Sequence, residues 1–219
     1  MWGGKDSNTN EVSSTVSSGV KTSGVGGSWA PPKEKEKIEE EAETTKVIGN
    51  EMFFYSEVTP ESILEFTEKF KILEIDLLKK AADLSDYKPS IKVNIMSEGG
   101  DMFAGLAAMN ILEKSRVEVV TVAQGSCCSA ATFMFMGGKK RLIGRNAYML
   151  IHQLSTDFWG KYEELKSEMK TCDKFMAMIK MIYTSRSKIP EKKLNKLMKK
   201  DLYLEPTKCL KYGIAHDID

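Results

Sequence analysis

The segment AQGSCCSAATFMFMGG, residues 123–138, places Ser126, Cys127, Cys128 and Ser129 between a glycine and an apolar run. A hydroxyl or thiol at such a turn can act as a nucleophile when a base takes its proton and N–H groups stabilise the resulting charge. The unpaired N–H groups at the start of a helix favour negative charge. Ser126 and Ser129 are therefore candidate nucleophiles, and the alternative is that both are helix caps or small packing residues.

A serine nucleophile needs a base, and the chain contains only two histidines, His152 and His216. His152 follows the apolar segment AYMLI, at the carboxyl end of a predicted strand, where sites in α/β proteins usually lie. A buried structural histidine is the alternative interpretation. His216 lies close to the C-terminus, in a stretch that we expect to fray, and is the weaker candidate.

Two further features could complete such a site. Asp201 follows a run of lysines and precedes LYLEP, so its carboxylate could orient a base, or it could be a cap or a surface residue. The segment SEGGD, residues 97–101, has two glycines after a predicted strand. Such a loop can expose its amides to a ligand, although by itself it is equally a turn.

The elements that must position these residues alternate between strand and helix patterns. Segments with strand composition are 46–58, 91–96, 117–123 and 147–152. Between them, a helix starts at Thr59 and Pro60 with an apolar stripe that ends at Leu84, a second covers 102–115, and a third starts within the 123–138 segment. This alternation predicts an α/β fold with parallel strand pairs.

Residues 160–187 are predicted to form one long helix. Seven apolar residues repeat at alternating spacings of three and four: Tyr162, Leu165, Met169, Cys172, Met176, Ile179 and Tyr183. Phe175, Met178 and Ile182 add a second apolar line. Such a helix must be covered on more than one side, either by another subunit or by its own domain. A short basic helix follows Pro190, with Leu194, Leu197 and Met198 facing inward.

Composition limits the possible functions. The chain has 219 residues, 42% hydrophobic residues and a formal net charge of +1, as expected for a globular domain. The charge gives no reason to expect a nucleic acid or a membrane surface as a partner. The four cysteines include no CxxC pair, so we expect free thiols, no zinc site and a cytoplasmic location. No secretory signal pattern is present.

The chain is expected to have two regions. Residues 1–44 comprise a segment rich in Ser, Thr and Gly followed by the charged stretch KEKEKIEEEAE. Because it contains few large apolar residues, we expect a disordered tail and linker. Residues 45–219 are expected to form the folded domain.

Taken in order, the motifs resemble those of the ClpP family, the proteolytic subunit of the Clp protease, from about residue 46 to 217. They are IMSEGGDMFAGLAAMNIL, GSCCSAATFMFMGGKKRLIGRNAYMLIHQ and DLYLEPTKCLKYG. The resemblance implies that Ser129 is the nucleophile, His152 the base and Asp201 the group that orients it. It also implies an oxyanion hole formed by the N–H groups of Gly100 and Ala130, with no metal or other cofactor.

The resemblance further implies a ClpP/crotonase-like α/β fold of repeated β-β-α units with a protruding handle helix, which matches residues 160–187. Members of the family cleave polypeptides inside seven-membered rings stacked in pairs. Cys127 and Cys128 would then take the place of two small alanines, as small buried residues.

The sequence departs from the family pattern at several positions. Glu98 replaces a proline beside the oxyanion loop, Ala130 replaces a methionine, and Leu154 replaces the proline after IHQ. The axial loops that meet a Clp-type ATPase unfoldase have no counterpart. A protease that works without an ATPase, such as a viral capsid-maturation protease, is therefore one alternative. A non-catalytic ring subunit and a crotonase-type acyl-CoA hydratase or isomerase are two others.

Overall fold

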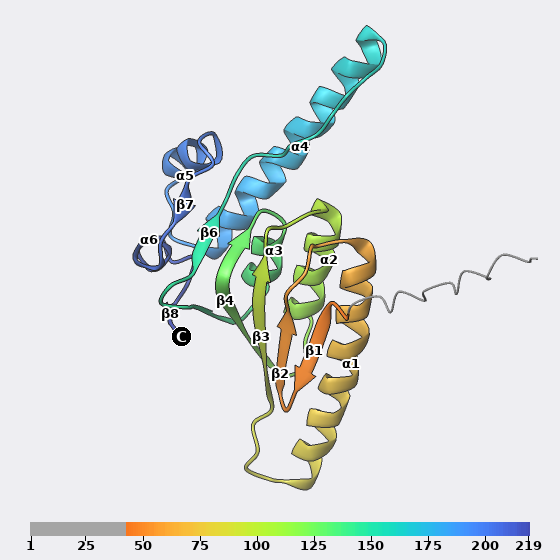
Figure 1. Cartoon of the computed structure of the whole chain (residues 1–219), viewed down its shortest axis with the longest axis vertical. Coiled ribbons are helices and arrows are strands. Elements are labelled where there is room, and N and C mark those ends of the chain that lie inside the picture. The colour runs from red at the N-terminus through yellow and green to blue at the C-terminus, as the bar shows by residue number, and fades with distance from the viewer. Residues whose placement is uncertain (1–42) are drawn as a thin grey trace, which may run out of the picture. The chain divides into compact units, whose positions relative to one another are not determined.

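The computed structural model describes residues 43–219, and these form a mixed α/β domain (Figure 1). The α/β class predicted from the alternating patterns is confirmed. The tail and linker expected over residues 1–44 lie outside the described residues, except for Glu43 and Thr44.

Eight strands and six helices follow one another in the described part of the chain. The strands are β1 (Thr45–Ile48), β2 (Glu51–Phe54), β3 (Ser90–Ser97), β4 (Glu118–Cys128), β5 (Lys140–Ile143), β6 (Tyr148–Leu150), β7 (Tyr203–Leu204) and β8 (Asp217–Ile218). The helices are α1 (Pro60–Asp83), α2 (Met102–Glu113), α3 (Ala131–Met136), α4 (Tyr162–Arg186), α5 (Glu191–Met198) and α6 (Pro206–Lys211).

The strands form one sheet in the order β1-β2-β3-β4-β5-β8, with β6 on β4 and β7 on β6. The pairs from β2 to β5 and from β5 to β8 are parallel, as is β4 with β6, whereas β1 with β2 and β6 with β7 are antiparallel. Parallel strands need helical crossovers, and α1 and α2 supply the first two. The predicted parallel pairs are therefore confirmed.

Strand β4 is longer than the sequence pattern predicted. The pattern gave a strand over 117–123 followed by a helix, but β4 continues to Cys128 and α3 begins only at Ala131. The first half of β4 pairs with β5, from Val120 to Ala123, and the second half pairs with β6. The second partner pairs with Ser126–Cys128, so Ser126 lies within a strand.

Helix α1 starts where its sequence predicts. The Thr59 hydroxyl accepts a hydrogen bond from the N–H of Ser62 at 3.1 Å, and the Ser62 hydroxyl accepts one from the N–H of Thr59 at 2.9 Å. Pro60 occupies the first turn, where no N–H is needed. The end differs from the prediction, because the helix stops at Asp83 and Leu84 is an exposed cap residue. The apolar stripe therefore ends at Leu77.

Helix α4 projects away from the sheet along the first half of its length (Figure 1). Tyr162 is 75% exposed and Met169 is 56% exposed, whereas Ile179, Ile182 and Tyr183 are buried in the domain. The domain thus buries the C-terminal part of the seam. In the N-terminal part, Leu165 and Cys172 are half-buried, whereas Tyr162 and Met169 stay exposed. The short basic helix is confirmed as α5, with its three apolar residues buried.

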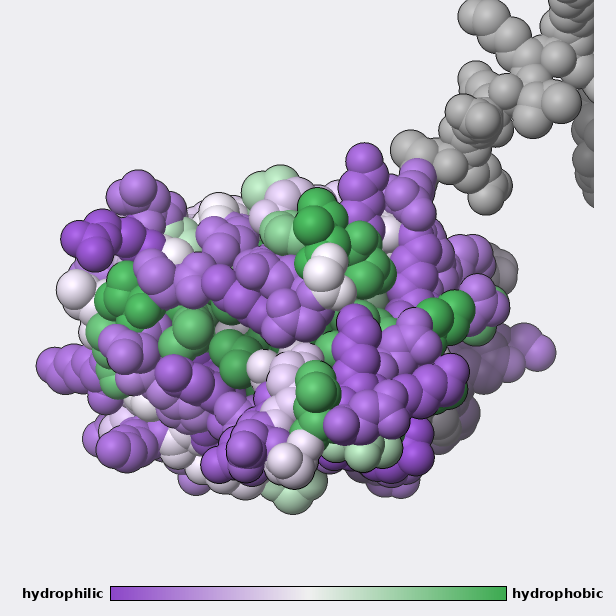
Figure 2. Space-filling model, turned by 90° about the horizontal axis from the view of Figure 1, so that it is seen from below, coloured by the Kyte–Doolittle hydropathy of each residue, from purple (hydrophilic) through white to green (hydrophobic). Residues whose placement is uncertain are grey.

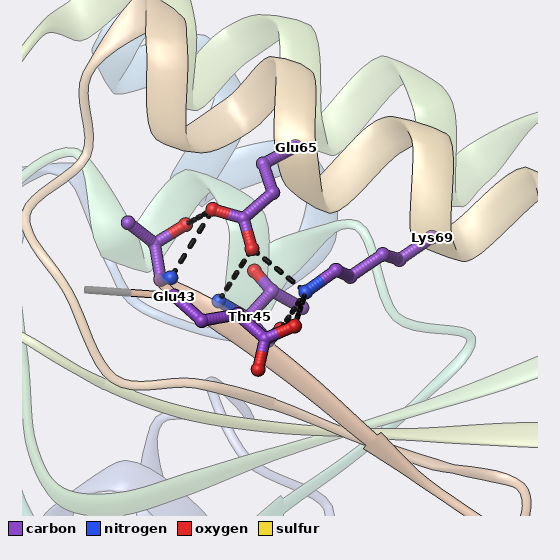
Figure 3. Close-up of polar contacts among 5 residues, drawn as sticks. Glu43, Thr45, Glu65 and Lys69 are labelled. Atoms are coloured by element: carbon purple, nitrogen blue, oxygen red, sulfur yellow. Dashed lines mark hydrogen bonds and ion pairs between the residues drawn. The ribbon is translucent and has the colours of Figure 1, made fainter. Parts of the chain in front are cut away.

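A polar cluster ties β1 to α1 where the domain begins (Figure 3). The Glu65 carboxylate accepts hydrogen bonds from Lys69 at 2.8 Å and from the N–H groups of Thr44 and Thr45 at 3.1 and 3.3 Å. The Thr44 hydroxyl also donates to it, and Lys69 reaches Glu43 and the carbonyl of Thr45. Burial alone raises the pKa of Glu65, but these donors outweigh it and lower the pKa to about 2.

We expect Glu65→Gln to lower the free energy of unfolding by about 1–2 kcal/mol at pH 7, because the donors lose a charged acceptor. The folded-state pKa lies below the ordinary glutamate value, so this contribution is present above that value and is lost as the pH falls toward the folded-state pKa. Chemical denaturation of both proteins should therefore show a difference that is full above about pH 5 and vanishes near pH 2.

Glu68→Gln is the matched control, because Glu68 is exposed on the same helix. It should change stability by less than about 0.5 kcal/mol at either pH. Equal effects of the two substitutions would contradict a stabilising role for the Glu65 cluster.

Candidate active site

Ser129 lies in the turn between β4 and α3, with a backbone φ of 51°. This left-handed conformation is unfavourable for a residue with a side chain and recurs at functional sites. Its N–H donates to the carbonyl of Leu150 at 2.9 Å, which extends the pairing of β4 with β6 by one bond. The half-buried Ser129 side chain lines a cavity.

The glycine loop that follows β3 passes directly beside Ser129. A Cβ atom at Gly99 would lie 2.6 Å from the Ser129 Cβ and 2.8 Å from the carbonyl oxygen of Cys128. Gly99 and Gly100 have φ values of 103° and 140°. Only glycine adopts such angles readily and leaves room for this approach. The loop therefore comes close to the turn because it has no side chains there.

Val58 fixes the other side of this loop. Its N–H donates to the carbonyl of Gly99 at 2.8 Å, and its carbonyl accepts from the N–H of Asp101 at 2.7 Å. The Asp101 side chain in turn caps α2 by accepting from the N–H of Ala104 at 2.7 Å. The loop is thus held at both ends while Gly100 stays exposed. Sequence reasoning did not identify Val58, because a buried valine carries no signal for this backbone pairing.

The site also holds the two backbone N–H groups that were expected to form an oxyanion hole. Within the described residues, the N–H groups of Gly100 and Ala130 donate to no acceptor. Both residues line the same cavity as Ser129. Unpaired N–H groups in such a place can stabilise an oxyanion.

His152 lines this cavity as well. It follows β6, which ends at Leu150, and the next residue is anchored because the Gln153 N–H donates to the carbonyl of Met198 at 3.1 Å. The pairing of β4 with β6 therefore brings His152 to the turn that carries Ser129. The predicted strand over 147–152 is shorter in the structure, so the half-buried His152 lies two residues beyond the carboxyl end of β6.

Asp201 lies two residues before β7, which pairs with β6. Leu150 lies opposite Tyr203 in the antiparallel pair of β6 and β7. His152 and Asp201 each lie two residues beyond this pair, outside the strands. Asp201 is exposed, has a φ of 45° and does not line the cavity. Within residues 43–219, no hydrogen bond joins the His152 imidazole to the Asp201 carboxylate or to the Ser129 hydroxyl.

The cavity has a volume of about 340 Å³ and a largely apolar wall. Phe103 and Phe175 meet edge to face, with their ring centres 5.4 Å apart. The apolar lining residues are Met102, Phe103, Ala130, Phe133, Leu154, Phe158, Phe175 and Ile179. Phe103 and Phe158 were not singled out from the sequence, because aromatic residues in a helix and a loop give no signal that they share a wall. A space of this kind accommodates a bulky apolar group next to Ser129.

The two cysteines before Ser129 are not suited to nucleophilic attack. Cys127 and Cys128 are both buried. Burial raises the pKa of the Cys127 thiol well above its usual value, and burial together with the nearby Glu98 carboxylate raises the pKa of Cys128 to about 12. Both thiols therefore stay protonated at neutral pH, whereas the reactive form of cysteine is the thiolate. They are small buried residues, as predicted.

Ser126 and Glu98 pair with each other outside the cavity. The Ser126 hydroxyl donates to the Glu98 carboxylate, and neither residue lines the cavity that contains Ser129. The expectation that Ser126 could lie at a helix start is wrong, because β4 runs through it. Glu98 is therefore directed toward Ser126, and Gly100 borders both the cavity of Ser129 and the separate hollow that Glu98 and Ser126 line.

His216 has a structural role instead of fraying. Its N–H donates to the Arg141 carbonyl at 2.8 Å, and its Nδ1 accepts from the Arg141 N–H at 3.1 Å. Burial and the neighbouring positive charges of Arg141, Lys140 and Lys188 lower its pKa. His216 does not line the cavity, so His152 is the only histidine at the site.

The described residues contain no cluster of three or more His, Cys, Asp or Glu side chains that could hold a metal ion. In the same part of the chain, no helix is both long enough and apolar enough to span a membrane.

Comparisons with known proteins show which family the chain resembles. Residues 51–219 match the Clp protease family. The chain is 28% identical over 138 residues to the ATP-dependent Clp protease proteolytic subunit of Deinococcus radiodurans, covering 62% of this chain and 68% of that protein. It is 28% identical over 164 residues to proteolytic subunit 2 of Borreliella burgdorferi, covering 74% and 78%. The match to the subunit of Oenothera elata spans only 56% of that protein.

The fold is similar to that of a ClpP1 mutant from Listeria monocytogenes, with a TM-score of 0.66 and 20% sequence identity. The superposition covers 78% of this chain and 91% of the Listeria chain. This likeness confirms the predicted ClpP-like α/β fold.

We expect Gly99→Ala to lower the free energy of unfolding by about 3 kcal/mol, because the new Cβ meets Ser129 and Cys128 and also adopts a strained φ. Gly49→Ala is the control, since Gly49 has a φ of 63° but open space around it. It should cost only about 1 kcal/mol. Chemical denaturation compares the two, and equal losses would show that the loop moves away from Ser129 without cost.

Proposed function

Because the chain belongs to the Clp protease family, we propose that it is a serine endopeptidase with Ser129 as its nucleophile. The observation that carries this proposal is that Ser129, His152 and two unpaired N–H groups converge on one cavity. These are the groups that peptide hydrolysis by a serine requires. The aromatic wall supports a polypeptide substrate with a bulky apolar side chain beside the cleaved bond.

In the first step, the Ser129 hydroxyl attacks the peptide carbonyl while His152 accepts its proton. A bond forms between the Ser129 oxygen and the carbonyl carbon, and the carbonyl oxygen gains a negative charge. The N–H groups of Gly100 and Ala130 donate to this oxygen. Each such donor contributes most in the transition state, where the charge develops.

In the second step, the tetrahedral intermediate collapses and the carbon–nitrogen bond breaks. Protonated His152 gives its proton to the leaving amine, and an acyl group remains on Ser129. Water then repeats the two steps and releases the acid. Asp201 orients the imidazole through a hydrogen bond that requires its exposed carboxylate to turn toward His152.

A non-catalytic ring subunit is the second candidate function. It is favoured by one observation: within the described residues, the imidazole of His152 makes no hydrogen bond to Ser129 or Asp201. Membership of the Clp protease family leaves no support for the acyl-CoA hydratase or isomerase alternative.

We also propose that the chain assembles with copies of itself into stacked rings through α4. The projecting half of this helix carries apolar residues such as Tyr162 and Met169 that its own domain does not cover. Figure 2 shows the face at the end of the molecule opposite to the tip of α4. That face is mainly hydrophilic, with separate small apolar patches. Exposed apolar groups on a projecting helix are suited to packing between subunits.

We expect a fluorophosphonate to label the purified protein on Ser129, located by mass spectrometry. Ser129→Ala should abolish labelling and lower peptide cleavage by about 10⁴-fold or more, and His152→Ala should suppress both. Ser126→Ala is the matched control, because Ser126 lies three residues away outside the cavity, and it should keep the activity.

An adduct on Ser126, or full activity in Ser129→Ala, would contradict the assignment of the nucleophile. A folded, assembled protein without any adduct would favour the non-catalytic ring subunit.

We expect Met169→Glu to prevent assembly, because it places a charge within the exposed apolar part of α4. Native mass spectrometry should show smaller species, with the circular dichroism spectrum unchanged. Lys170→Glu is the control, since it adds the same side chain at the next, already charged position. Ile179 is unsuitable for this test because it is buried in its own domain. An unchanged oligomer in Met169→Glu would exclude this part of α4 from the interface.

A further inference from the structure

A buried hydrogen-bond chain connects the base of α4 to the turn that carries Ser129. The Tyr183 hydroxyl lies 2.5 Å from the Thr132 Oγ1, and the Thr132 Oγ1 lies 2.5 Å from the carbonyl oxygen of Ser129. Thr132 is fully buried and Tyr183 is 2% exposed. The ring of Tyr183 packs against Phe133, with 6.0 Å between ring centres, and borders the cavity.

The donors in this chain can be assigned. A threonine hydroxyl has one proton, and the Ser129 carbonyl can only accept, so Thr132 donates to Ser129. The Tyr183 hydroxyl must then donate to Thr132. Burial raises the pKa of Tyr183, so its phenol stays protonated at neutral pH and remains a donor.

The carbonyl that ends this chain belongs to the same peptide group as the N–H of Ala130. A peptide group is planar, and in the trans form its C=O and N–H point in opposite directions. Holding the Ser129 carbonyl therefore fixes the direction of the Ala130 N–H. The N–H of Thr132 also donates to this carbonyl, at 3.0 Å. Because Ser129 has an unfavourable φ of 51°, this peptide group needs such restraints to keep its orientation.

We propose that Thr132 and Tyr183 are positioning residues that hold the Ala130 N–H in its oxyanion-binding orientation. This inference rests on the proposed peptidase function, in which Ala130 supplies one of the two oxyanion donors. The chain also polarises the Ser129–Ala130 peptide group, since a hydrogen bond to its carbonyl makes its N–H a stronger donor. Neither side chain touches the substrate's reacting carbonyl in this scheme. Their effect is therefore expected in the transition state rather than in substrate binding.

The test compares Tyr183→Phe, Thr132→Val, the double variant and Thr132→Ser with the wild-type protein. A peptide substrate gives kcat and KM, and a peptide aldehyde, whose adduct with serine carries an oxyanion, gives an inhibition constant. We expect kcat to fall about 10-fold in Tyr183→Phe and about 100-fold in Thr132→Val, with KM changed less than about twofold. Aldehyde affinity should fall in parallel with kcat.

The double variant and the conservative variant sharpen this test. The double variant should be no slower than Thr132→Val, because the tyrosine acts through the threonine. Thr132→Ser keeps the hydroxyl and should restore most of kcat. Thr121→Val is the matched control. The Thr121 hydroxyl of β4 is also buried, and it donates to the carbonyl of Phe135 at 2.7 Å, in the helix α3 that contains Thr132. This substitution should lower stability while leaving kcat unchanged.

Other outcomes would overturn the inference. A wild-type protein that cleaves peptides, with kcat unchanged in Tyr183→Phe and Thr132→Val, would overturn it while leaving the proposed function intact. An equal loss of kcat in Thr121→Val would assign the effect to general destabilisation. If Thr132→Val does not fold, the kcat of Tyr183→Phe decides whether the inference holds, because this variant keeps the packing of the ring. A folded, assembled wild-type protein without activity or labelling would overturn the proposed function and this inference together.

Discussion

Strand β4 changes partners along its length, and the geometry of the candidate site depends on that change. Its first half pairs with β5 and its second half with β6, while β3 lies along its other side. One end of β4 thus meets both the strand that leads to His152 and the strand that leads to the glycine loop. The register between β3 and β4 shifts after Ile95, and the loop turns toward Ser129. Residues far apart in the sequence meet there because parallel strands end at the same edge of the sheet.

Backbone conformation decides how closely these segments approach. Ser129 and Asp201 are the non-glycine residues with positive φ among those described, and both are candidate members of the catalytic triad. Gly99 can lie against Ser129 because it has no side chain, and a Cβ atom there would overlap Ser129. Such strained positions persist only when neighbouring contacts hold them. Val58 holds the glycine loop, and the pairing of β4 with β6 holds the turn at Ser129.

Helix α4 contributes two different surfaces. Its N-terminal half projects with exposed apolar residues, and its C-terminal part is buried against the domain beside the cavity. Tyr183 belongs to the buried part and reaches Thr132 in α3. The helix proposed to assemble the subunits is therefore also connected, through Thr132, to the turn that carries the proposed nucleophile. A substitution in the projecting part and one in the buried part should consequently have separable effects on assembly and on catalysis.

The sequence alone determined the α/β class, the start of α1 at Thr59 and the long helix, because these follow from local periodicity and capping. It also determined the order of the candidate residues, which follows from motif spacing. It did not determine that β4 runs through Ser126, since the partner that keeps this stretch extended, β6, lies about 20 residues further along the chain. The fixing of His216 by Arg141 and the pairing of Ser126 with Glu98 were hidden for the same reason. The close approach of Gly99 to Ser129 and the contact of Tyr183 with Thr132 also exist only after the sheet and α4 have packed. Local sequence specifies what each segment prefers, but only long-range pairing and burial decide which backbone groups remain free to act.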